Sequence, residues 1–312
     1  MDNNYLVSVI IPNYCHAKYL DQRIQSILNQ TYQNFELIIL DDCSPDNGAS
    51  KAVIEKYRNN SHVSHIVYNE TNSGSTFKQW DKGIKLAKGE FIWIAESDDF
   101  CEPNLLEVIV REFERDNKLT LAYTLLKKVD ADGNPIPYLC WTPRGVIRLR
   151  GHDYVRRYMT TCNHCANASA VVFKKSIYSL IDKQFLTYKA GGDHLFWIEI
   201  AEQGNVAIVN KRLNFFRQHN VKVTGKSVRA GINTREFKNT YQYLESHFNL
   251  SPWRSQLIKD STHVRILKTD YDTEDVRKSL LHYWGFPHHI SKLKKAKVKL
   301  IEVLRNRCGI FL

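Results

Sequence analysis

Apolar residues follow two alternating spacings through the first half of the chain. Largely apolar segments over residues 5–11, 35–40 and 91–95 predict buried strands, and a shorter segment near 65–68 predicts another. Between these segments, apolar residues recur every three or four positions, as one buried face of a helix requires. This pattern predicts an α/β domain whose mostly parallel, doubly wound sheet is flanked by helices.

The pattern continues past residue 100 and changes near residue 226. Pro103 opens a predicted helix, and residues 119–126 are typical of a strand that runs into a turn at Asp132-Gly133. From about Lys226 the chain becomes mainly helical. Since 312 residues exceed the usual domain size of roughly 100 to 200 residues, we expect a domain over residues 1–225 and a basic helical region over 226–312.

Acidic residues stand directly after two of the predicted strands. The predicted strand over residues 35–40 is followed by Asp41-Asp42, and the one over residues 91–95 is followed by Glu96-Ser97-Asp98-Asp99. Ligands of open α/β sheets bind at the carboxyl ends of the strands, so both clusters point to one crevice. Adjacent carboxylates repel each other unless a cation lies between them and an anionic ligand. The sequence therefore predicts a nucleotide-diphosphate site with a metal ion.

Charge and composition limit the partners and the compartment. The formal net charge is +11 and the pI is about 9.2, which makes nucleic acid, membrane surfaces and polyphosphate ligands the candidates. Residues 1–5 lack a basic start and no apolar run is long enough to span a bilayer, so we expect a cytoplasmic protein. Seven scattered cysteines fit reduced thiols better than a disulfide framework.

Several segments, in this order, resemble a family 2 glycosyltransferase. Residues 7–14, 26–32 and 35–46 resemble the start of the family, and the similarity continues through residues 72–74 and 87–90. Residues 96–99 resemble its DxD-type metal-binding motif. Gly192-Asp193 resembles its acidic general-base motif, and residues 216–219 resemble the arginine-to-histidine strand near the end of its catalytic domain. The resemblance implies a GT-A fold, a nucleotide-sugar donor and inversion at the anomeric carbon.

The resemblance assigns residues 1–100 to the nucleotide sugar and residues 101–225 to the acceptor. Pro12, Asn13 and Tyr14 close the first strand, where the tyrosine ring can stack on a base. Asp42 could accept the N3 hydrogen of uracil, and Asp41 could hold the ribose or order the loop. The alternative is a packing role for Tyr14 and a turn at Asp41-Asp42 with local hydrogen bonds. A uridine donor rests on the resemblance alone.

The second acidic cluster is interpreted as the metal site. Asp99 is the predicted direct ligand of Mg²⁺ or Mn²⁺, and Asp98 would contact the ribose or the metal's water shell. Glu96 and Ser97 would face the nucleotide sugar, although the family more often has aspartate where this chain has Glu96. The alternative, a cap for the helix opened by Pro103, conflicts with the spacing, because capping groups lie directly before the first turn.

Asp193 is the predicted general base, which removes the proton from the acceptor hydroxyl. Its spacing alone equally suits a simple helix cap, and the family resemblance favours the base. His219 could complete the metal shell as a neutral imidazole or stabilise the departing diphosphate as a cation, and Arg217 could also stabilise the diphosphate. Gly74 would belong to the nucleotide-sugar site, and Lys78 after the Gly74 loop is a further phosphate candidate, for which a solvated helix face is the alternative.

Cysteines at residues 162 and 165 lie close to His164, which could suggest a zinc site. A structural zinc site normally needs a second pair of ligands, and the sequence offers none. We therefore interpret residues 162–165 as a wall on the acceptor side.

The last predicted helix is amphipathic and basic. Ile290, Leu293, Leu300 and Leu304 share one face, and lysines crowd the remainder. Such a helix can lie on an anionic leaflet or can dock on the catalytic domain with a solvated basic face, and both possibilities stay open.

The sequence thus predicts a metal-dependent hexosyltransferase that moves a sugar, most readily from a UDP-sugar, to a glycan or lipid-linked glycan. The product would be a surface polysaccharide or glycolipid. If the last helix binds lipid, the enzyme would lie at the inner face of the plasma membrane. The alternatives are a GT-A-like nucleotidyltransferase, which lacks the expected Gly-rich loop here, and a non-catalytic nucleotide-sugar-binding protein. No motif supports binding to nucleic acid.

Overall fold

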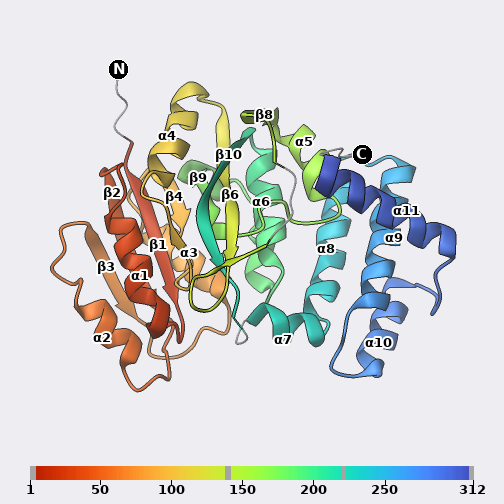
Figure 1. Cartoon of the computed structure of the whole chain (residues 1–312), viewed down its shortest axis with the longest axis horizontal. Coiled ribbons are helices and arrows are strands. Elements are labelled where there is room, and N and C mark those ends of the chain that lie inside the picture. The colour runs from red at the N-terminus through yellow and green to blue at the C-terminus, as the bar shows by residue number, and fades with distance from the viewer. Residues whose placement is uncertain (1–4, 138–141, 220–222, 309–312) are drawn as a thin grey trace.

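A ten-stranded sheet runs through the structure, a computed structural model that describes residues 5–137, 142–219 and 223–308 (Figure 1). The strand order is β3-β2-β1-β4-β9-β6-β10-β5, with β7 beside β6 and β8 beside β10. The strands are β1 (Val7–Asn13), β2 (Phe35–Asp41), β3 (Val63–Tyr68), β4 (Phe91–Ile94), β5 (Phe100–Cys101), β6 (Leu119–Val129), β7 (Pro135–Ile136), β8 (Val146–Arg150), β9 (Val171–Lys174) and β10 (Asn205–Arg217).

The predicted α/β fold class is confirmed, and the sheet is mixed in its second half. Strands β3, β2, β1 and β4 are parallel neighbours, and β6 is parallel to β10. Strand β9 runs antiparallel between β4 and β6, and β5, β7 and β8 are also antiparallel to their partners. The parallel half therefore brings the carboxyl ends of β1, β2 and β4 to one edge, as the apolar pattern indicated.

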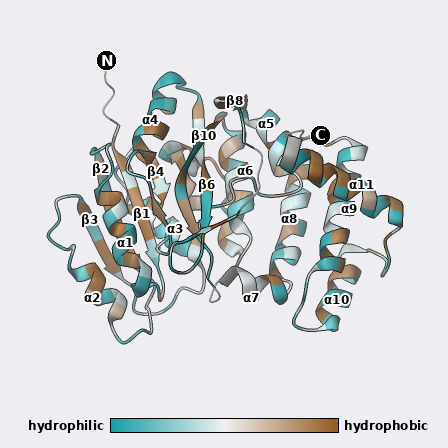
Figure 2. Ribbon diagram, in the orientation of Figure 1, coloured by the Kyte–Doolittle hydropathy of each residue, from teal (hydrophilic) through white to brown (hydrophobic). Residues whose placement is uncertain are grey.

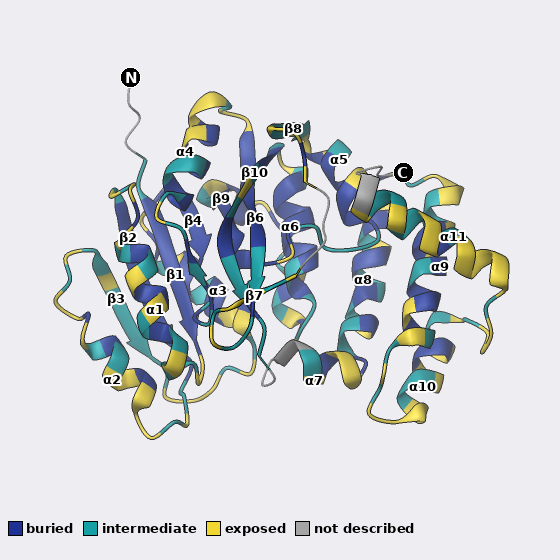
Figure 3. Cartoon of the chain, viewed as in Figure 1, coloured by how far each residue is buried: buried dark blue, intermediate teal, exposed yellow. Residues whose placement is uncertain are grey.

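Helices cover both faces of the sheet, and each face has its own core. Because side chains alternate along a strand, Ile10 faces the core beneath α3 and α6, whereas Val9 and Ile11 face the core beneath α1 and α4. Figure 2 shows apolar residues concentrated in the strands, and Figure 3 shows the same strands buried. The helices of this part are α1 (Ala17–Leu28), α2 (Ala49–Glu55), α3 (Thr76–Leu86), α4 (Leu105–Arg115), α5 (Gly151–Tyr154) and α6 (Gly192–Glu202).

The carboxy-terminal part is helical, as the composition change near Lys226 predicted. Its helices are α7 (Val223–Arg229), α8 (Ile232–His247), α9 (Pro252–Lys268), α10 (Glu274–Trp284) and α11 (Lys292–Val303), at the right of Figure 1. Hydroxyl caps begin three of them, because Ser251, Thr273 and Ser291 accept a backbone N–H from the first turn of α9, α10 and α11. Leu244 and Phe248 at the end of α8 belong to the same core as Ile10, so α8 packs directly on the part that contains the sheet.

Within the described residues, no helix is both long enough and apolar enough to cross a membrane. Residues 1–4, on which the predicted absence of a signal peptide depends, lie outside the described part of the chain.

Candidate active site

A cavity of about 410 Å³ opens at the carboxyl edge of the parallel strands. It is lined by most of the predicted site residues, which come from several separate segments of the chain: Pro12, Asn13, Tyr14, Asp42, Gly74, Glu96, Ser97, Asp98 and Asp193. Asp41, Lys78, Asp99, Arg217 and His219 stand outside this lining. The predicted crevice therefore exists, and its members divide into residues that face it and residues that support it.

Asp42 organises the part of the cavity after β2. Its Oδ1 accepts hydrogen bonds from Asn69 Nδ2 at 2.6 Å, Ser73 N at 2.9 Å and Gln79 Nε2 at 2.8 Å. Its Oδ2 accepts from Ser73 Oγ at 2.7 Å, which leaves that oxygen the greater capacity to accept a further donor. The carboxylate thereby fixes the loop that carries Gly74, whose φ of 73° is easily adopted only by glycine.

Asp41 orders the loop after β2 and does not face the cavity. It accepts from Asn13 Nδ2 at 2.7 Å and from the backbone and hydroxyl of Ser44 at 3.0 and 2.7 Å. Of the two roles expected for Asp41, this geometry fits the ordering of the loop.

Two amide oxygens beside the cavity lack a protein partner among the described residues. Asn13 Oδ1 and Gln79 Oε1 are buried, and neither accepts a hydrogen bond. Because a buried acceptor without a donor is costly, these oxygens suit the N–H or O–H groups of a bound ligand. Tyr14 lines the cavity and is 42% exposed, so part of its side chain is open to a ligand.

The acidic cluster after β4 separates into residues with different surroundings. Asp98 Oδ2 lies 3.0 Å from His219 Nε2, and His16 completes a group whose ligand atoms lie within 4.8 Å of one another. Asp99 points into the protein, where its oxygens accept from Asn167 Nδ2 at 2.8 Å and Arg217 N at 3.0 Å. The structure therefore gives Asp98 the position beside His219 that we expected for Asp99.

Burial shifts the titration of the cluster. Burial raises the pKa of Glu96 to about 8, and the neighbouring Asp98 carboxylate adds to the shift. Burial and Asp98 also raise the pKa of Asp99. Trp80 Nε1 donates to Glu96 Oε1 at 3.0 Å, so Glu96 is held against the cavity wall. The cluster therefore resists carrying its full negative charge unless a cation compensates it.

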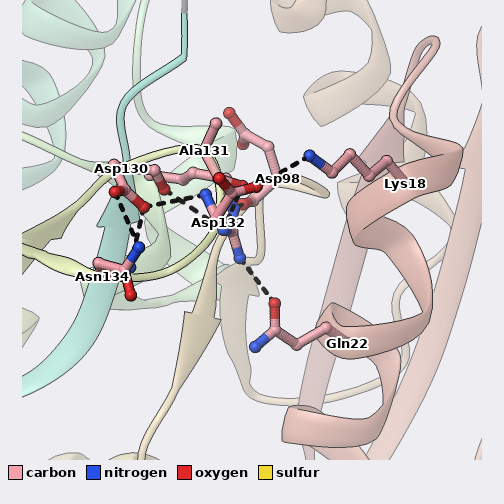
Figure 4. A network of polar contacts seen from close by, with 8 residues as sticks. Lys18, Gln22, Asp98, Asp130, Ala131, Asp132 and Asn134 are labelled. Carbon is pink, nitrogen blue, oxygen red and sulfur yellow. Dashed lines mark hydrogen bonds and ion pairs between the residues drawn. The ribbon is translucent and has the colours of Figure 1, made fainter.

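Arg217 supports the acidic turn from behind. Its Nε donates to the Asp98 carbonyl at 2.8 Å, and its terminal nitrogens donate to the Ala131 carbonyl at 3.0 Å and to Gln22 Oε1 at 2.6 Å. Figure 4 shows this network between the acidic turn, α1 and the turn at Asp130–Asn134. Because Arg217 is buried and its donors are engaged, its position is that of a scaffold and not of a phosphate ligand.

Lys78 is also placed away from the ligand space. Its Nζ donates to the Ser73 carbonyl at 3.1 Å, next to the loop that Asp42 fixes.

Asp193 lies in the first turn of α6 and lines the same cavity. Asn163 Nδ2 donates to its Oδ2 at 2.8 Å, and burial raises the pKa of Asp193 to about 6. The preceding Gly192 has no room for a side chain, since a Cβ there would lie 2.8 Å from both the Phe77 ring and the Phe185 carbonyl. The glycine therefore lets α6 pack closely enough to present Asp193.

Sequence reasoning missed several residues of this site. His16 lies directly before α1 and His219 just after β10, and no spacing in the sequence links the two. Asn163 belongs to the segment that we interpreted as the acceptor-side wall, and the adjoining Ala166, Asn167 and Ala168 do line the cavity. Gln79 and Trp80 lie on a predicted helix, and nothing in the sequence indicated that their polar atoms face the site. Each of these contacts depends on tertiary packing.

Comparison with known proteins identifies the family. The sequence model described as "Glycosyl transferase family 2" matches residues 8–179, which is more than half of the chain.

Three similar proteins illustrate the relationship. The chain is 33% identical over 129 residues to "Glycosyltransferase GlyG" of Streptococcus pneumoniae, covering 41% of this chain and 42% of that protein. It is 30% identical over 141 residues to the "Putative teichuronic acid biosynthesis glycosyltransferase TuaG" of Bacillus subtilis, covering 45% and 54%. It is 30% identical over 198 residues to the "Poly(ribitol-phosphate) beta-N-acetylglucosaminyltransferase TarP" of Staphylococcus aureus, covering 62% and 56%. The chain thus matches about half the length of each relative.

Solved structures of S. aureus TarS share the fold across nearly the whole chain. TarS residues 1–349 superpose with a TM-score of 0.58 at 19% identity, covering 96% of this chain and 79% of that one. The same fragment solved with UDP-GlcNAc gives a TM-score of 0.58 at 18% identity, covering 96% and 81%. Together with the confirmed α/β fold and the cavity at its strand ends, the matched residues show that this chain belongs to glycosyltransferase family 2.

Proposed function

We propose that the chain transfers a sugar, with inversion, from a UDP-sugar to a hydroxyl of a glycan or lipid-linked glycan in surface polysaccharide synthesis. The observation that carries this proposal is one cavity that joins an acidic cluster and an exposed aromatic ring to a buried carboxylate with a raised pKa. The names of TuaG and TarP, which refer to teichuronic acid and poly(ribitol phosphate), support a surface polymer as the product.

The donor would bind between Tyr14 and the acidic turn. Tyr14 would stack on the base, while Asp42 Oδ2 and the unpaired amide oxygens of Asn13 and Gln79 would accept its N–H and the ribose hydroxyls. TarS has been solved with UDP and with UDP-GlcNAc, which supports a uridine donor for this chain.

A divalent metal would be held by Asp98, His219 and His16. Their one oxygen and two imidazole nitrogens are close enough to share an ion. Imidazole donors suit transition metals better than Mg²⁺, which demands oxygen ligands, so of the two predicted ions the donor set favours Mn²⁺. When bound, the ion would neutralise charge on the diphosphate. Asp99 would keep the turn in place through Asn167 and Arg217.

Asp193 would accept the proton of the acceptor hydroxyl. The hydroxyl oxygen then forms a bond to the anomeric carbon while the bond from that carbon to the diphosphate breaks, and UDP leaves with the electron pair. A pKa raised to about 6 makes Asp193 a stronger base than an ordinary aspartate while leaving it ionised at neutral pH.

The basic helix α11 would place the enzyme on an anionic membrane surface, near a lipid-linked acceptor. It packs on α9 through Val298, yet Leu293 is 81% exposed and Leu300 is 58% exposed among its lysines. Trp253, at the start of α9, is 44% exposed beneath Lys297. Exposed apolar side chains surrounded by lysines suit the boundary between headgroups and acyl chains.

Titration calorimetry with UDP, with and without Mn²⁺, tests the donor site. We expect binding that requires Mn²⁺ and is lost in Asp98→Asn. Asp99→Asn should weaken binding less, because its effect passes through the turn. Binding of UDP that is indifferent to Mn²⁺ and to Asp98 would contradict the metal site, and the absence of heat with UDP in every condition would contradict the uridine donor.

A further inference from the structure

Helix α8, outside the stretch that matches the family model, reaches the loop in front of Asp193. The Glu236 carboxylate accepts three consecutive backbone N–H groups: Lys189 at 2.6 Å on Oε1, and Ala190 at 3.1 Å and Gly191 at 2.7 Å on Oε2. Lys189 and Ala190 line the cavity. One side chain of the helical region therefore holds the whole backbone segment that leads into α6.

The next residue of α8 holds the other side of Asp193. The Phe237 ring stacks on the imidazole of His194, with centroids 5.7 Å apart and an angle of 10° between the planes. Burial lowers the pKa of His194 to about 4, so the ring is neutral at physiological pH, and its Nε2 lies 2.7 Å from the Met159 carbonyl, to which it donates. Asp193 thus lies between two positions that α8 fixes.

Three N–H groups converging on one carboxylate make a strong local restraint. Hydrogen bonds to an ionised acceptor are roughly twice as strong as neutral ones, and without Glu236 these amides would need other acceptors. Gly191 also packs against this carboxylate, since a Cβ at Gly191 would lie 3.4 Å from Glu236 Oε2. Small displacements of a catalytic group can lower a rate strongly, so a loop fixed in this way matters for catalysis.

We propose that Glu236 is a positioning residue for sugar transfer: from the carboxy-terminal helices, it fixes the 189–191 loop and thereby the orientation of Asp193 toward the acceptor. This inference rests on the proposed role of Asp193 as the general base. It makes the helical region a part of the catalytic site.

The charge of Glu236 also acts on Asp193 through space. The groups near Asp193 are Glu236 on α8, Lys189 in the loop, Cys165 in the wall segment and the neutral His194 on α6 itself. Glu236 raises the pKa of Asp193, whereas the Asn163 hydrogen bond lowers it. Removal of the Glu236 charge should therefore let Asp193 ionise at a lower pH.

Hydrogen exchange on the full-length chain tests the restraint without any substrate. In the wild type the amides of residues 189–191 should exchange slowly, and in Glu236→Gln they should exchange at least about tenfold faster. Glu245→Gln is the matched control, because Glu245 lies on the same helix, is exposed and bonds Tyr241. Unprotected amides in the wild type, or unchanged exchange in Glu236→Gln, would overturn the proposal.

Release of UDP from UDP-GlcNAc in the presence of Mn²⁺, with water in place of the acceptor hydroxyl, tests the catalytic part. We expect kcat to fall about tenfold in Glu236→Gln with KM for UDP-GlcNAc nearly unchanged, and the acidic limb of the kcat profile to move to lower pH. Glu236→Asp retains the charge with a shorter reach, so kcat should fall while the acidic limb of its pH profile stays at the wild-type position. This variant also tests the proposal if Glu236→Gln fails to fold. A wild-type rate and limb in Glu236→Gln would refute the catalytic role.

Inactivity of the wild type toward UDP-GlcNAc would contradict that donor, and the exchange experiment would still decide whether Glu236 fixes the loop.

Discussion

At the scale of single residues, Asp193 combines properties that come from different neighbours. Burial raises its pKa, Asn163 fixes one of its oxygens, and the bare Cα of Gly192 lets α6 approach Phe77. The same burial that strengthens the base makes its ionised form costly in the folded state. Activity and stability should therefore oppose each other at this position.

Asp193→Asn should lower the rate of sugar transfer by about 10²- to 10⁴-fold while leaving UDP affinity nearly unchanged. In the wild type, kcat should fall as the pH drops below about 6, because protonated Asp193 cannot accept a proton. Steady-state UDP release between pH 5 and 8, with calorimetry as the control, measures both effects. A wild-type rate in Asp193→Asn would exclude its role as the base.

The same variant should be more stable than the wild type at pH 8. The folded pKa of about 6 lies above the ordinary value of 3.8, so ionisation favours the unfolded chain as the pH rises through this window. The penalty is complete above about pH 6 and absent below about pH 4. Asparagine avoids it, so we expect a gain of up to about 3 kcal/mol in unfolding free energy at pH 8. An equal loss of stability at pH 4 and pH 8 would contradict this account.

At the scale of elements, the end of β10 ties together segments that are distant in the sequence. Arg217 links the acidic turn after β4 to α1 through Gln22 and to the turn before β7 through Ala131, as Figure 4 shows for the labelled partners. Its guanidinium also lies 4.5 Å from the Tyr19 ring centroid. The next residues of the chain bring His219 to Asp98, so the position of the proposed metal ligands depends on this junction.

Arg217→Lys should therefore destabilise the fold and weaken Mn²⁺-dependent UDP binding together. Lysine cannot reproduce the planar fork that reaches Asp98, Ala131 and Gln22, and we expect a loss of about 3 kcal/mol in unfolding free energy. Arg212→Lys on the same strand is the control, since Arg212 is only half-buried. Thermal unfolding measures the stability and calorimetry measures the UDP affinity. An unchanged UDP affinity in Arg217→Lys would show that UDP binding does not depend on the contacts of Arg217.

At the scale of the whole molecule, the excess of 44 basic over 33 acidic residues is gathered in part on the last helix. Figure 3 shows α11 with much of its length exposed at the edge of the molecule, away from the sheet. Among the described residues, none of α11 lines the cavity at the strand ends, so we expect the cavity and the basic helix to be able to bind different partners at the same time.

Removal of the residues past Pro287 should lower binding to vesicles that contain phosphatidylglycerol, and binding to phosphatidylcholine vesicles should be weak throughout. The double variant Leu293→Ser/Leu300→Ser should have the same effect without deleting packed residues, because both side chains are exposed. Leu180→Ser, 63% exposed on another part of the surface, is the control. Undiminished sedimentation of both α11 variants with the anionic vesicles would refute the membrane role.

The spacing of apolar residues predicted most helices and strands of the first half, but it predicted their first and last residues less accurately. The predicted strand over residues 5–11 lies at Val7–Asn13, because it pairs residue by residue with β2 as far as Asp41. The run that gave β4 and the acidic residues after it were placed correctly at the carboxyl edge. Local pattern decides such features, because burial of one strand or one helix face depends on residues close together in the chain.

The tertiary structure alone decided which atoms meet. Sequence could name both Asp98 and Asp99 but not which one faces His219, since neighbouring side chains diverge in a turn whose backbone Arg217 fixes. It gave no sign of His16 beside His219, or of Glu236 beneath the 189–191 loop, because those contacts join segments far apart in the chain. The sequence by itself thus determined the fold class, the family resemblance and the edge at which the site lies. Packing between distant elements decided the proposed metal-ligand set and the support of Asp193, because side-chain direction and reach are set only when the elements dock.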